Sequence, residues 1–386
     1  MENFDAVIIG GGAAGMACAV SLAKNSKLKI AIVEAGDRLG KKIAATGNGQ
    51  GNVSNVDMRV EHFHGGNLEL VNKIACNDPY EGTYLFDCLF SADDRGRIYP
   101  SGRQASALND CLISKLNNCG VKIVYSKAVK LTKDLNVFLE NGKMLFAKYV
   151  VLCTGGKAQK QFKTDGSAYL LATALGHSVT KLYPSLVQLK TDTTHIKTLR
   201  GIRADCIVTA LIDGKPVKSA RGDVIFTEYG VSGNAVFTVS AYISDSQNSE
   251  ISIEFLPDID KKTIIDNLKT RKENNTATGE LLSGTLHNQI GRAIISRVGS
   301  DDVQKIAKML KNFTLPIVGT LGFDYAQVTK GGINMNEVTC ELESKLVKNL
   351  FFAGEILDID GDCGGYNLHW AFTSGKTVAK NILKRL

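Results

Sequence analysis

The sequence predicts an α/β fold in which one nucleotide-binding domain is built from two separate stretches of the chain. A short apolar run at residues 5–9 leads straight into a glycine-rich turn and an apolar helix, the pattern of a buried parallel strand and its crossover. A second apolar run at 29–33 ends in an acidic residue. Another strand, glycine turn and helix follow only at 350–386. We therefore assign 1–190 and 325–386 to one discontinuous domain.

The first glycine turn has the spacing of a dinucleotide fingerprint, G-x-G-x-x-G. Gly10 permits the tight turn, Gly12 lets backbone amides approach a pyrophosphate, and Gly15 lets the helix pack closely on the strand. The exposed N–H groups and the helix dipole would bind the phosphates. Glu34 follows Gly15 by 19 residues, near the ~20 expected for the acid that holds an adenosine ribose hydroxyl. These features predict a bound dinucleotide and disfavour NADP at this turn, but they leave NAD and FAD open.

Three later glycine-rich segments favour FAD. A loop at 40–52 and the turn Thr154–Gly156 offer small residues and amides to a ring system. The third segment, Gly364–Leu368, stands directly before the predicted C-terminal helix at 369–386. Beside an isoalloxazine, the start of that helix would stabilise the negative charge that develops at N1/O2 on reduction. An enzyme that uses only nicotinamide has no need of this distant element, so the sequence predicts FAD.

The composition is that of an ordinary soluble globular protein, and the nine cysteines, read as reduced thiols, predict a cytoplasmic location. The chain is 44% hydrophobic and 22% charged, and no apolar run reaches the ~18–20 residues of a membrane span. The nine cysteines contain no CxxC pair, and 100–350 lacks a second fingerprint, which excludes a two-dinucleotide disulfide reductase. His62 and His64 stand without a recognisable set of metal ligands, so no metal is expected. The net charge of +7 is spread thinly, and we expect neither nucleic acid nor membrane as a partner.

Many short motifs together resemble the BaiN/YhiN-like flavoproteins, a group of bacterial FAD-dependent oxidoreductases that includes aminoacetone-oxidase-like members. The matching segments are Gly10–Gly15, Lys41–Asn55, Gly96–Pro100, Gln104–Ala107, Thr154–Lys157, Pro184–Val187, Leu199–Arg203, Phe226–Gly233, Val328–Gly332, Gly354–Asp358 and Gly364–Leu368. The resemblance implies non-covalent FAD and two insertions in the discontinuous Rossmann-like domain. A β-rich domain would occupy 191–257 with 313–324, and a small helical domain 258–312.

Two positions near the expected flavin depart from the family's pattern. Gln50-Gly51 stands where the family usually carries Arg-Cys before the Asn of the glycine loop, and His369 stands where Gln is common. His369 would bring a group that titrates near neutral pH to the cofactor. The alternative is an ordinary helix residue that faces the sheet. We name His369 and Tyr366 as candidate catalytic residues.

The remaining site residues follow from these segments and the resemblance. The predicted FAD-binding residues are Gly10, Gly12, Ala13, Ala14, Gly15, Glu34, Ala35, Lys42, Thr46, Gly47, Asn48, Gly49, Asn52, Val129, Thr154, Gly155, Gly156, Gly354, Glu355, Gly364, Gly365, Tyr366, Asn367 and Leu368. The candidate substrate-binding residues are Arg200, Arg203, Tyr229 and Asn234, since an arginine fork suits a carboxylate or ketone. Each of these four could equally lie on the surface or between domains.

The expected chemistry is that of the cofactor. FAD would exchange a hydride at N5 with a small organic substrate, while the protein supplies position, dryness and proton donors. NAD(P)H or oxygen would be the second redox partner. A flavoenzyme that modifies tRNA and a non-catalytic flavin-binding sensor remain as alternatives. The fingerprint names neither the substrate nor the direction of the reaction.

Overall fold

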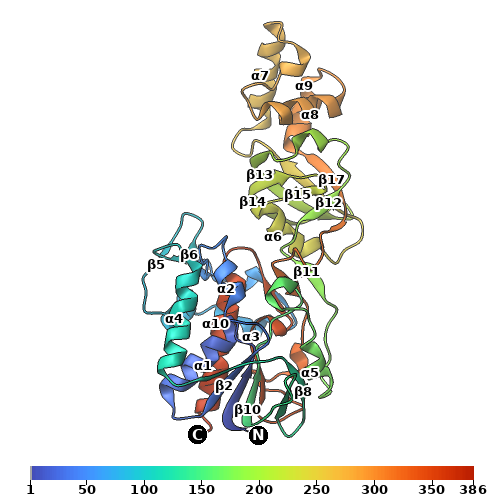
Figure 1. The fold of residues 1–386 in the computed structure, drawn as a ribbon. Coiled ribbons are helices and arrows are strands. Elements are labelled where there is room, and N and C mark those ends of the chain that lie inside the picture. The colour runs from blue at the N-terminus through green and yellow to red at the C-terminus, as the bar shows by residue number, and fades with distance from the viewer. Residues whose placement is uncertain (1) are drawn as a thin grey trace. The chain divides into compact units, whose positions relative to one another are not determined.

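The computed structural model describes residues 2–386, which form two compact units (Figure 1). Unit 1 contains the chain up to Tyr183 and again Val328–Leu386, and unit 2 contains Pro184–Gln327. The chain leaves unit 1 along β11 (Tyr183–Ser185) and re-enters it along β18 (Val328–Lys330). Among these described residues, no helix is both long and apolar enough to cross a membrane.

Unit 1 is built on a seven-stranded sheet with the order β7-β2-β1-β10-β9-β8 and β19 as a further partner of β10. The parallel strands are β7 (Lys122–Tyr125), β2 (Ile30–Glu34), β1 (Glu2–Ile9), β10 (Met144–Leu152) and β19 (Leu350–Phe352). On the same side of β10, its first residues pair with the antiparallel hairpin β9–β8 (Asn136–Leu139, Ala128–Leu131), and its last residues pair with β19. The strand near the C-terminus thus completes the sheet begun at the N-terminus.

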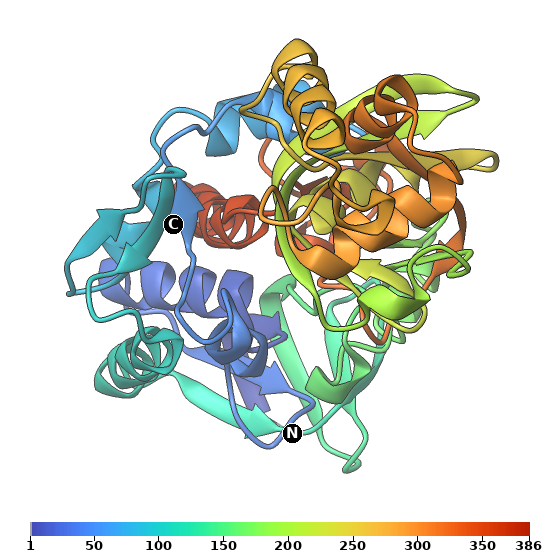
Figure 2. The same ribbon diagram turned by 90° about the horizontal axis from the view of Figure 1, so that it is seen from above.

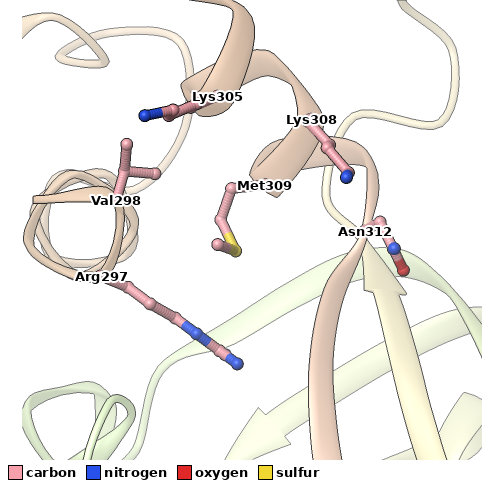
Figure 3. Close-up of a pocket in the computed structure, with 6 residues that line it drawn as sticks. All are labelled: Arg297, Val298, Lys305, Lys308, Met309 and Asn312. Atoms are coloured by element: carbon pink, nitrogen blue, oxygen red, sulfur yellow. The ribbon is translucent and has the colours of Figure 1, made fainter. Parts of the chain in front are cut away.

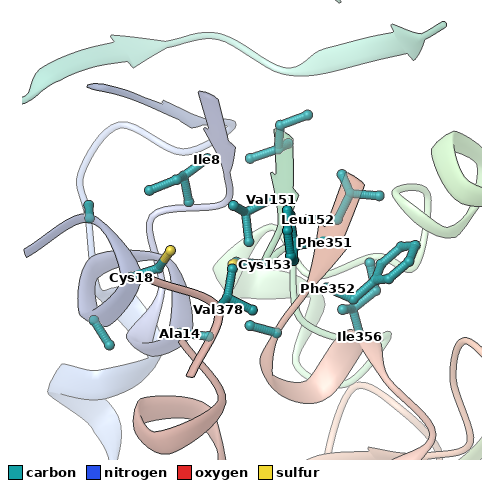
Figure 4. Close-up of a cluster of buried hydrophobic side chains, with 14 of the residues drawn as sticks. Ile8, Ala14, Cys18, Val151, Leu152, Cys153, Phe351, Phe352, Ile356 and Val378 are labelled. Atoms are coloured by element: carbon teal, nitrogen blue, oxygen red, sulfur yellow. The ribbon is translucent and has the colours of Figure 1, made fainter. Parts of the chain in front are cut away.

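Helices α1 (Ala13–Asn25) and α10 (Tyr366–Leu383) lie side by side against this sheet (Figures 1 and 2). Every residue of α1 from Ala14 to Val20 is buried, because the sheet covers one side of the helix and α10 another. The helices approach closely at Gly375, where a Cβ would collide with the backbone of Ala14. The core beneath them is apolar and combines strand residues such as Ile8 with Phe351 and Phe352 (Figure 4).

Smaller elements surround the sheet of unit 1. The other helices are α2 (Lys41–Ala45), α3 (Leu68–Ala75), α4 (Ala105–Asn118) and α5 (Tyr169–Thr173). Strands β3 (Ser54–Asn55), β6 (Arg97–Pro100) and β5 (Phe90–Ala92) form a small antiparallel sheet, and β20 (Ile359–Gly361) pairs with β4 (Phe63–Gly65). These elements carry the loops that surround the site described below.

Unit 2 consists of a closed barrel and four α-helices. The barrel order is β12 (Leu189–Thr191), β15 (Gly230–Ser232), β14 (Lys215–Phe226), β13 (Arg203–Ile212), β16 (Ser249–Glu254) and β17 (Phe313–Thr320). Helix α6 (Asn234–Ile243) packs on β13 and β14. Helices α7 (Lys261–Glu273), α8 (Asn288–Val298) and α9 (Val303–Lys311) occupy the segment expected to be helical. One hydrophobic cluster runs from the barrel into these helices. The predicted division of this region into a β-rich domain and a small helical domain stays a prediction.

Candidate flavin-binding site

The predicted FAD-binding segments meet at one edge of the sheet in unit 1. Gly10 follows β1, Ala35 follows β2, Thr154 follows β10 and Gly354 follows β19. Because these four strands are parallel neighbours, their carboxyl ends lie along the same edge, where open α/β sheets bind ligands. Val129 is the exception, since it lies on the antiparallel strand β8 and is exposed.

In the glycine turn, the surrounding protein leaves no room for a side chain at Gly10 and Gly15, whereas Gly12 borders free space. A Cβ at Gly10, where φ is +108°, would collide with the carbonyl oxygen of Cys153, and a Cβ at Gly15 would collide with that of Gly10. Apart from the chain neighbours of Gly12, no described atom lies within 4 Å of the position that a Cβ would take there. Gly12 is also the residue before the first turn of α1. The free space therefore lies where a pyrophosphate would meet the helix N-terminus.

Glu34 is held beside this turn by two backbone amides. Its Oε2 accepts a hydrogen bond from Gly11 N at 2.8 Å, and its Oε1 accepts one from Gly36 N at 2.6 Å. A carboxylate has about four lone-pair sites, so both oxygens keep capacity for a ribose hydroxyl. The geometry agrees with the role that the spacing predicts.

Glu355 joins three of the predicted segments. Its Oε2 pairs with Lys42 Nζ at 2.7 Å, and its Oε1 accepts from Thr329 N at 2.9 Å. The Thr329 hydroxyl in turn accepts from the amides of Lys157 and Ala158, which follow the Thr154–Gly156 turn. Lys42 and Glu355 are both predicted FAD-binding residues, but their ion pair has no signature in the sequence.

Thr154 supplies an unused polar group at the same edge. Its hydroxyl is buried and has no hydrogen-bond partner within residues 2–386. Buried hydroxyls are normally satisfied, so this one points to an acceptor or donor that belongs to a bound molecule. The open space at Gly12 and the unsatisfied Thr154 hydroxyl both fit FAD.

Two predicted amide side chains are used by the protein itself. Asn52 Nδ2 donates to Ser54 O and Ile98 O at 2.9 and 3.1 Å, and the side chain is buried. Asn367 exchanges two hydrogen bonds with the backbone of Gly361, at 2.9 and 2.7 Å. These contacts fix the glycine loop and the turn before α10, so both residues shape the site through backbone placement.

At Gln50-Gly51, where the sequence departs from the family's usual Arg-Cys, the structure shows close packing at Gly51 and an arginine beside Gln50. A Cβ at Gly51 would press on Leu108 and on Ala105 at 3.0 and 3.1 Å, which favours glycine there. Gln50 Oε1 accepts from Arg103 Nη1 at 3.4 Å, and the Arg103 guanidinium lies 4.1 Å from the centre of the Tyr99 ring. A cation from a different segment thus lies beside the loop at this point.

His369 is completely buried, and both of its ring nitrogens contact the protein. Nε2 lies 2.9 Å from Ala75 O, which can only accept, and Nδ1 lies 2.9 Å from Ser54 Oγ. Burial lowers the pKa of His369 to about 4, so the ring is neutral near pH 7. This environment favours a structural role for His369, the alternative considered from the sequence.

We expect His369→Gln to leave the pH dependence of flavin reduction unchanged between about pH 6 and pH 9, because the wild-type ring does not titrate there. His369→Ala should lower the free energy of unfolding by about 1–3 kcal/mol, since it leaves the buried Ala75 carbonyl without a donor. Stopped-flow reduction and urea titration measure the two effects. A pH profile altered in the glutamine variant would restore His369 as a catalytic candidate.

His62 forms a cluster that the sequence analysis missed. Its Nδ1 lies 3.0 Å from Asp362 Oδ2 and its Nε2 lies 3.1 Å from Asp57 Oδ2. Its ring stacks on Tyr366 at 4.5 Å between centroids, and Phe63 meets the same tyrosine edge-on. Tyr366 itself is buried, which raises the pKa of its hydroxyl. Asp362 is 300 residues away in sequence, so no local pattern could have revealed the pair.

The two carboxylates favour the protonated form of His62. Hydrogen bonds to Asp362 and then Asp57 raise the pKa of His62 against the opposing effect of burial. The Arg59 guanidinium and His62 in turn hold the pKa of Asp57 at about 2. His64 extends the cluster, with Nδ1 3.4 Å from Asp360 Oδ2 and Nε2 3.4 Å from Asp362 Oδ1. Within residues 2–386, no three such side chains are arranged to hold a metal ion.

The pairing of His62 predicts a pH-dependent contribution to stability. Because the pKa is raised in the folded state, the contribution is complete below the ordinary value of 6.5 and is lost as the pH rises through the folded value. The difference in unfolding free energy between wild type and His62→Gln should therefore shrink with rising pH above 6.5. Urea titrations of both proteins across this range measure it. If the difference in unfolding free energy between the two proteins stayed constant with pH, the raised pKa of His62 would be contradicted.

The candidate substrate residues all lie in unit 2. Arg200 pairs with Glu228 at 2.9 Å and Arg203 with Asp223 at 2.5 Å, and both arginine side chains are largely exposed. The backbone carbonyl of Tyr229 accepts from Thr191 N, and Asn234 begins α6. Their assignment to substrate binding stays a prediction.

The chain is similar to known proteins over nearly its whole length. The model of the HI0933-like protein Rossmann domain matches residues 4–381. The chain belongs to this HI0933-like family. A 3-dehydro-bile acid delta(4,6)-reductase of Clostridium scindens is 32% identical over 403 residues, with 98% of each chain covered. A ribosomal RNA dihydrouridine synthase of Escherichia coli is 26% identical over 422 residues, with 99% of each chain covered.

Solved structures show the same fold at much lower identity. A flavocytochrome c3 fumarate reductase superposes with a TM-score of 0.53 at 15% identity, covering 99% of this chain and 78% of the other. The 3-ketosteroid delta1-dehydrogenase of Sterolibacterium denitrificans gives 0.51 at 12% identity, with both chains fully covered. The predicted family, Rossmann-type fold and oxidoreductase class are thereby confirmed. This HI0933-like chain is a flavoprotein oxidoreductase.

Proposed function

We propose that the chain is an FAD-dependent reductase of a small, largely apolar organic molecule, with NAD(P)H as the source of electrons. The observation that carries the proposal is the shared sheet edge, where Gly12 leaves open space, Glu34 is held beside the turn, and Thr154 presents an unused hydroxyl. The name of the 32% identical relative, a reductase of 3-dehydro-bile acids, supports the direction and the substrate class.

Different residues around this edge would bind different parts of FAD. The amides of the Gly10–Gly15 turn and the start of α1 would bind the pyrophosphate, and Glu34 the adenosine ribose. The start of α10 at Tyr366 presents a positive dipole end that favours negative charge nearby. When bound, FAD supplies hydride exchange at N5. The Lys42–Glu355 pair keeps the glycine loop and the β19 end in register, so the site keeps its shape.

Tyr366 remains a candidate catalytic residue, and we propose that its hydroxyl contacts the substrate. It is held between the His62 ring and Phe63, so its orientation is fixed before any substrate arrives. Its raised pKa keeps the hydroxyl protonated at neutral pH, so it can donate a hydrogen bond. Such a donor would orient a carbonyl group. Tyr366→Phe should therefore raise the KM of the substrate while FAD stays bound.

The test is anaerobic titration of the purified, FAD-loaded protein with NADH and NADPH, followed by reoxidation with candidate substrates. Loss of the visible flavin band on addition of either nicotinamide, and its return with an unsaturated steroid ketone, would support the proposal. A flavin that neither nucleotide reduces, but that an organic donor reduces and oxygen then reoxidises, would show an oxidase and overturn the proposal.

A second candidate function is reduction of uridine in ribosomal RNA. Two relatives, from Escherichia coli and Haemophilus influenzae, carry the name ribosomal RNA dihydrouridine synthase at 26% identity over nearly the whole chain. The positive net charge of +7 is compatible with RNA binding. Incubation of the reduced protein with unmodified ribosomal RNA decides between the two, because formation of dihydrouridine would favour this candidate over a small-molecule reductase.

A further inference from the structure

A pocket rich in positive charge lies entirely within unit 2, at the ends of α8 and α9. Its volume is about 270 Å³, and we call it the cationic pocket. Its lining residues are Arg297, Val298, Lys305, Lys308, Met309 and Asn312 (Figure 3). Three of the six are cations and none is an acid. Neither the flavin nor the substrate proposal makes use of this site.

Arg297 is the strongest indication that a ligand belongs here. Its Nη2 donates to Thr314 O at 2.8 Å, and its guanidinium lies 4.5 Å from the centre of the Phe313 ring. These two contacts draw the side chain inward from the last turn of α8. Its Nη1 is then buried with no acceptor among residues 2–386. A buried guanidinium nitrogen without an acceptor is unfavourable, and a bound anion would satisfy it.

The two lysines of α9 that line the pocket are weakly paired, and Asp192 acts electrostatically on Arg297 but forms no ion pair with it among residues 2–386. Lys311 pairs with Glu254 and with Leu256 O, both at 2.6 Å. Lys308, one turn earlier, has no ion pair in the described part of the chain, and Lys305 has only Asp302 at 4.0 Å. Cations in the last turn of a helix also complement its dipole. The helix dipole explains why lysines stand in the last turn of α9, but it does not explain the buried Nη1 of Arg297.

The chemistry of the lining selects the kind of anion. Three cations exceed the single charge of a carboxylate, whereas a phosphate ester carries up to about two negative charges and three acceptor oxygens. Val298 and Met309 add apolar wall beside the charged groups. Asn312 uses its amide oxygen to accept from Ser252, which leaves its amide nitrogen as a further donor.

We propose that the cationic pocket binds a phosphate group attached to an organic body, with Arg297 and Lys308 as its principal contacts. A free nucleotide presents such a phosphate monoester, whereas each phosphate of an RNA backbone is a diester with a single negative charge. The charge of the pocket therefore favours the free nucleotide, and RNA is the alternative that the test distinguishes. Because the site lies in unit 2 and involves no flavin residue, its failure would leave the FAD proposal untouched, and the reverse also holds.

The test is isothermal titration of the FAD-loaded full chain, in which the dinucleotide site is already filled. Wild type is titrated with inorganic phosphate, with AMP and with a single-stranded RNA of about eight nucleotides. We expect saturable binding of AMP or RNA that phosphate weakens. Lys308→Glu should weaken it at least about tenfold, because it replaces an attraction with a repulsion. Lys269→Glu, an exposed position on α7 outside the pocket, is the matched control for the change in net charge.

The outcomes are separable. Binding of AMP that Lys308→Glu weakens and Lys269→Glu does not would support a free phosphate ester. The same pattern with RNA alone would support the backbone of a nucleic acid. No binding of any of the three ligands, or equal loss in both variants, would overturn the proposal. Arg297→Lys is a second variant that keeps the charge, and a loss of binding there with an unchanged melting temperature would assign the contact to the guanidinium fork.

Discussion

Replacing Gly12 with valine should abolish tight FAD binding while the apoprotein stays folded. Gly12 has an extended backbone that valine can adopt, and apart from its chain neighbours no described atom lies within 4 Å of its Cβ position. The branched side chain would therefore occupy the space that the pyrophosphate needs. We expect the Kd for FAD to rise at least about 100-fold, which corresponds to roughly 2.7 kcal/mol. Flavin fluorescence during titration of the apoprotein measures the change.

Two further variants make the Gly12 experiment decisive. Gly279→Val, in unit 2, has equally open surroundings and should leave FAD affinity unchanged. Gly15→Ala should instead destabilise the apoprotein itself, since its Cβ would strike the carbonyl of Gly10. If Gly12→Val bound FAD as tightly as wild type, the pyrophosphate would not lie at this turn. If it unfolded the apoprotein, the space beside Gly12 would be filled by the protein.

The parts of the site that could be predicted from the sequence are those specified locally. Gly10–Gly15 follows its strand directly, and Glu34 ends the next one, so spacing along the chain reflects spacing in the sheet. The C-terminal strand and helix could be assigned to the same domain because their strand–glycine–helix pattern repeats the first. The fold class followed from these units, since parallel neighbours place their carboxyl ends together.

What the sequence could not show depends on contacts between distant segments. Lys42 meets Glu355 across 313 positions and His62 meets Asp362 across 300, and neither pair has a local signature. The sequence suggests that His369 titrates near neutral pH, because nothing in it shows that the ring is buried. The burial of His369 against Ser54 and Ala75 depends on how α10 packs. Burial, which decides its pKa, is a property of the assembled fold.

The barrel of unit 2 shows the same limit for secondary structure. Short runs of alternating residues at 206–212, 223–226 and 251–255 predict strands, and they overlap β13, β14 and β16. β12 and β15 contain three residues each, too few to show a period of two. β12 is a strand because β17, over 120 residues later, pairs with it and closes the barrel, and β15 is a strand because it pairs with β12 and β14. Tertiary pairing, and not local preference, decides these elements.

Replacing Phe313 with alanine should strongly destabilise all of unit 2. Phe313 begins β17, is completely buried, pairs with Ile253 and packs edge-on against Phe255 at 5.6 Å. The same ring lies against Arg297 of α8, so one side chain supports both the barrel and the helices. Losing a buried phenylalanine costs about 3–5 kcal/mol, and Phe313→Leu should cost less because most of the volume remains. Urea unfolding followed by circular dichroism measures the loss.

Hydrogen exchange in the Phe313→Ala protein then tests whether unit 2 is one cooperative body. The barrel strands and α7–α9 share one hydrophobic cluster, so their amides should lose protection together. The chain's single tryptophan, Trp370, lies in unit 1 and serves as an internal reference for the fold of that unit. Loss of protection confined to α7–α9, with the barrel amides unchanged, would instead show that 258–312 folds as the separate helical domain expected from the sequence.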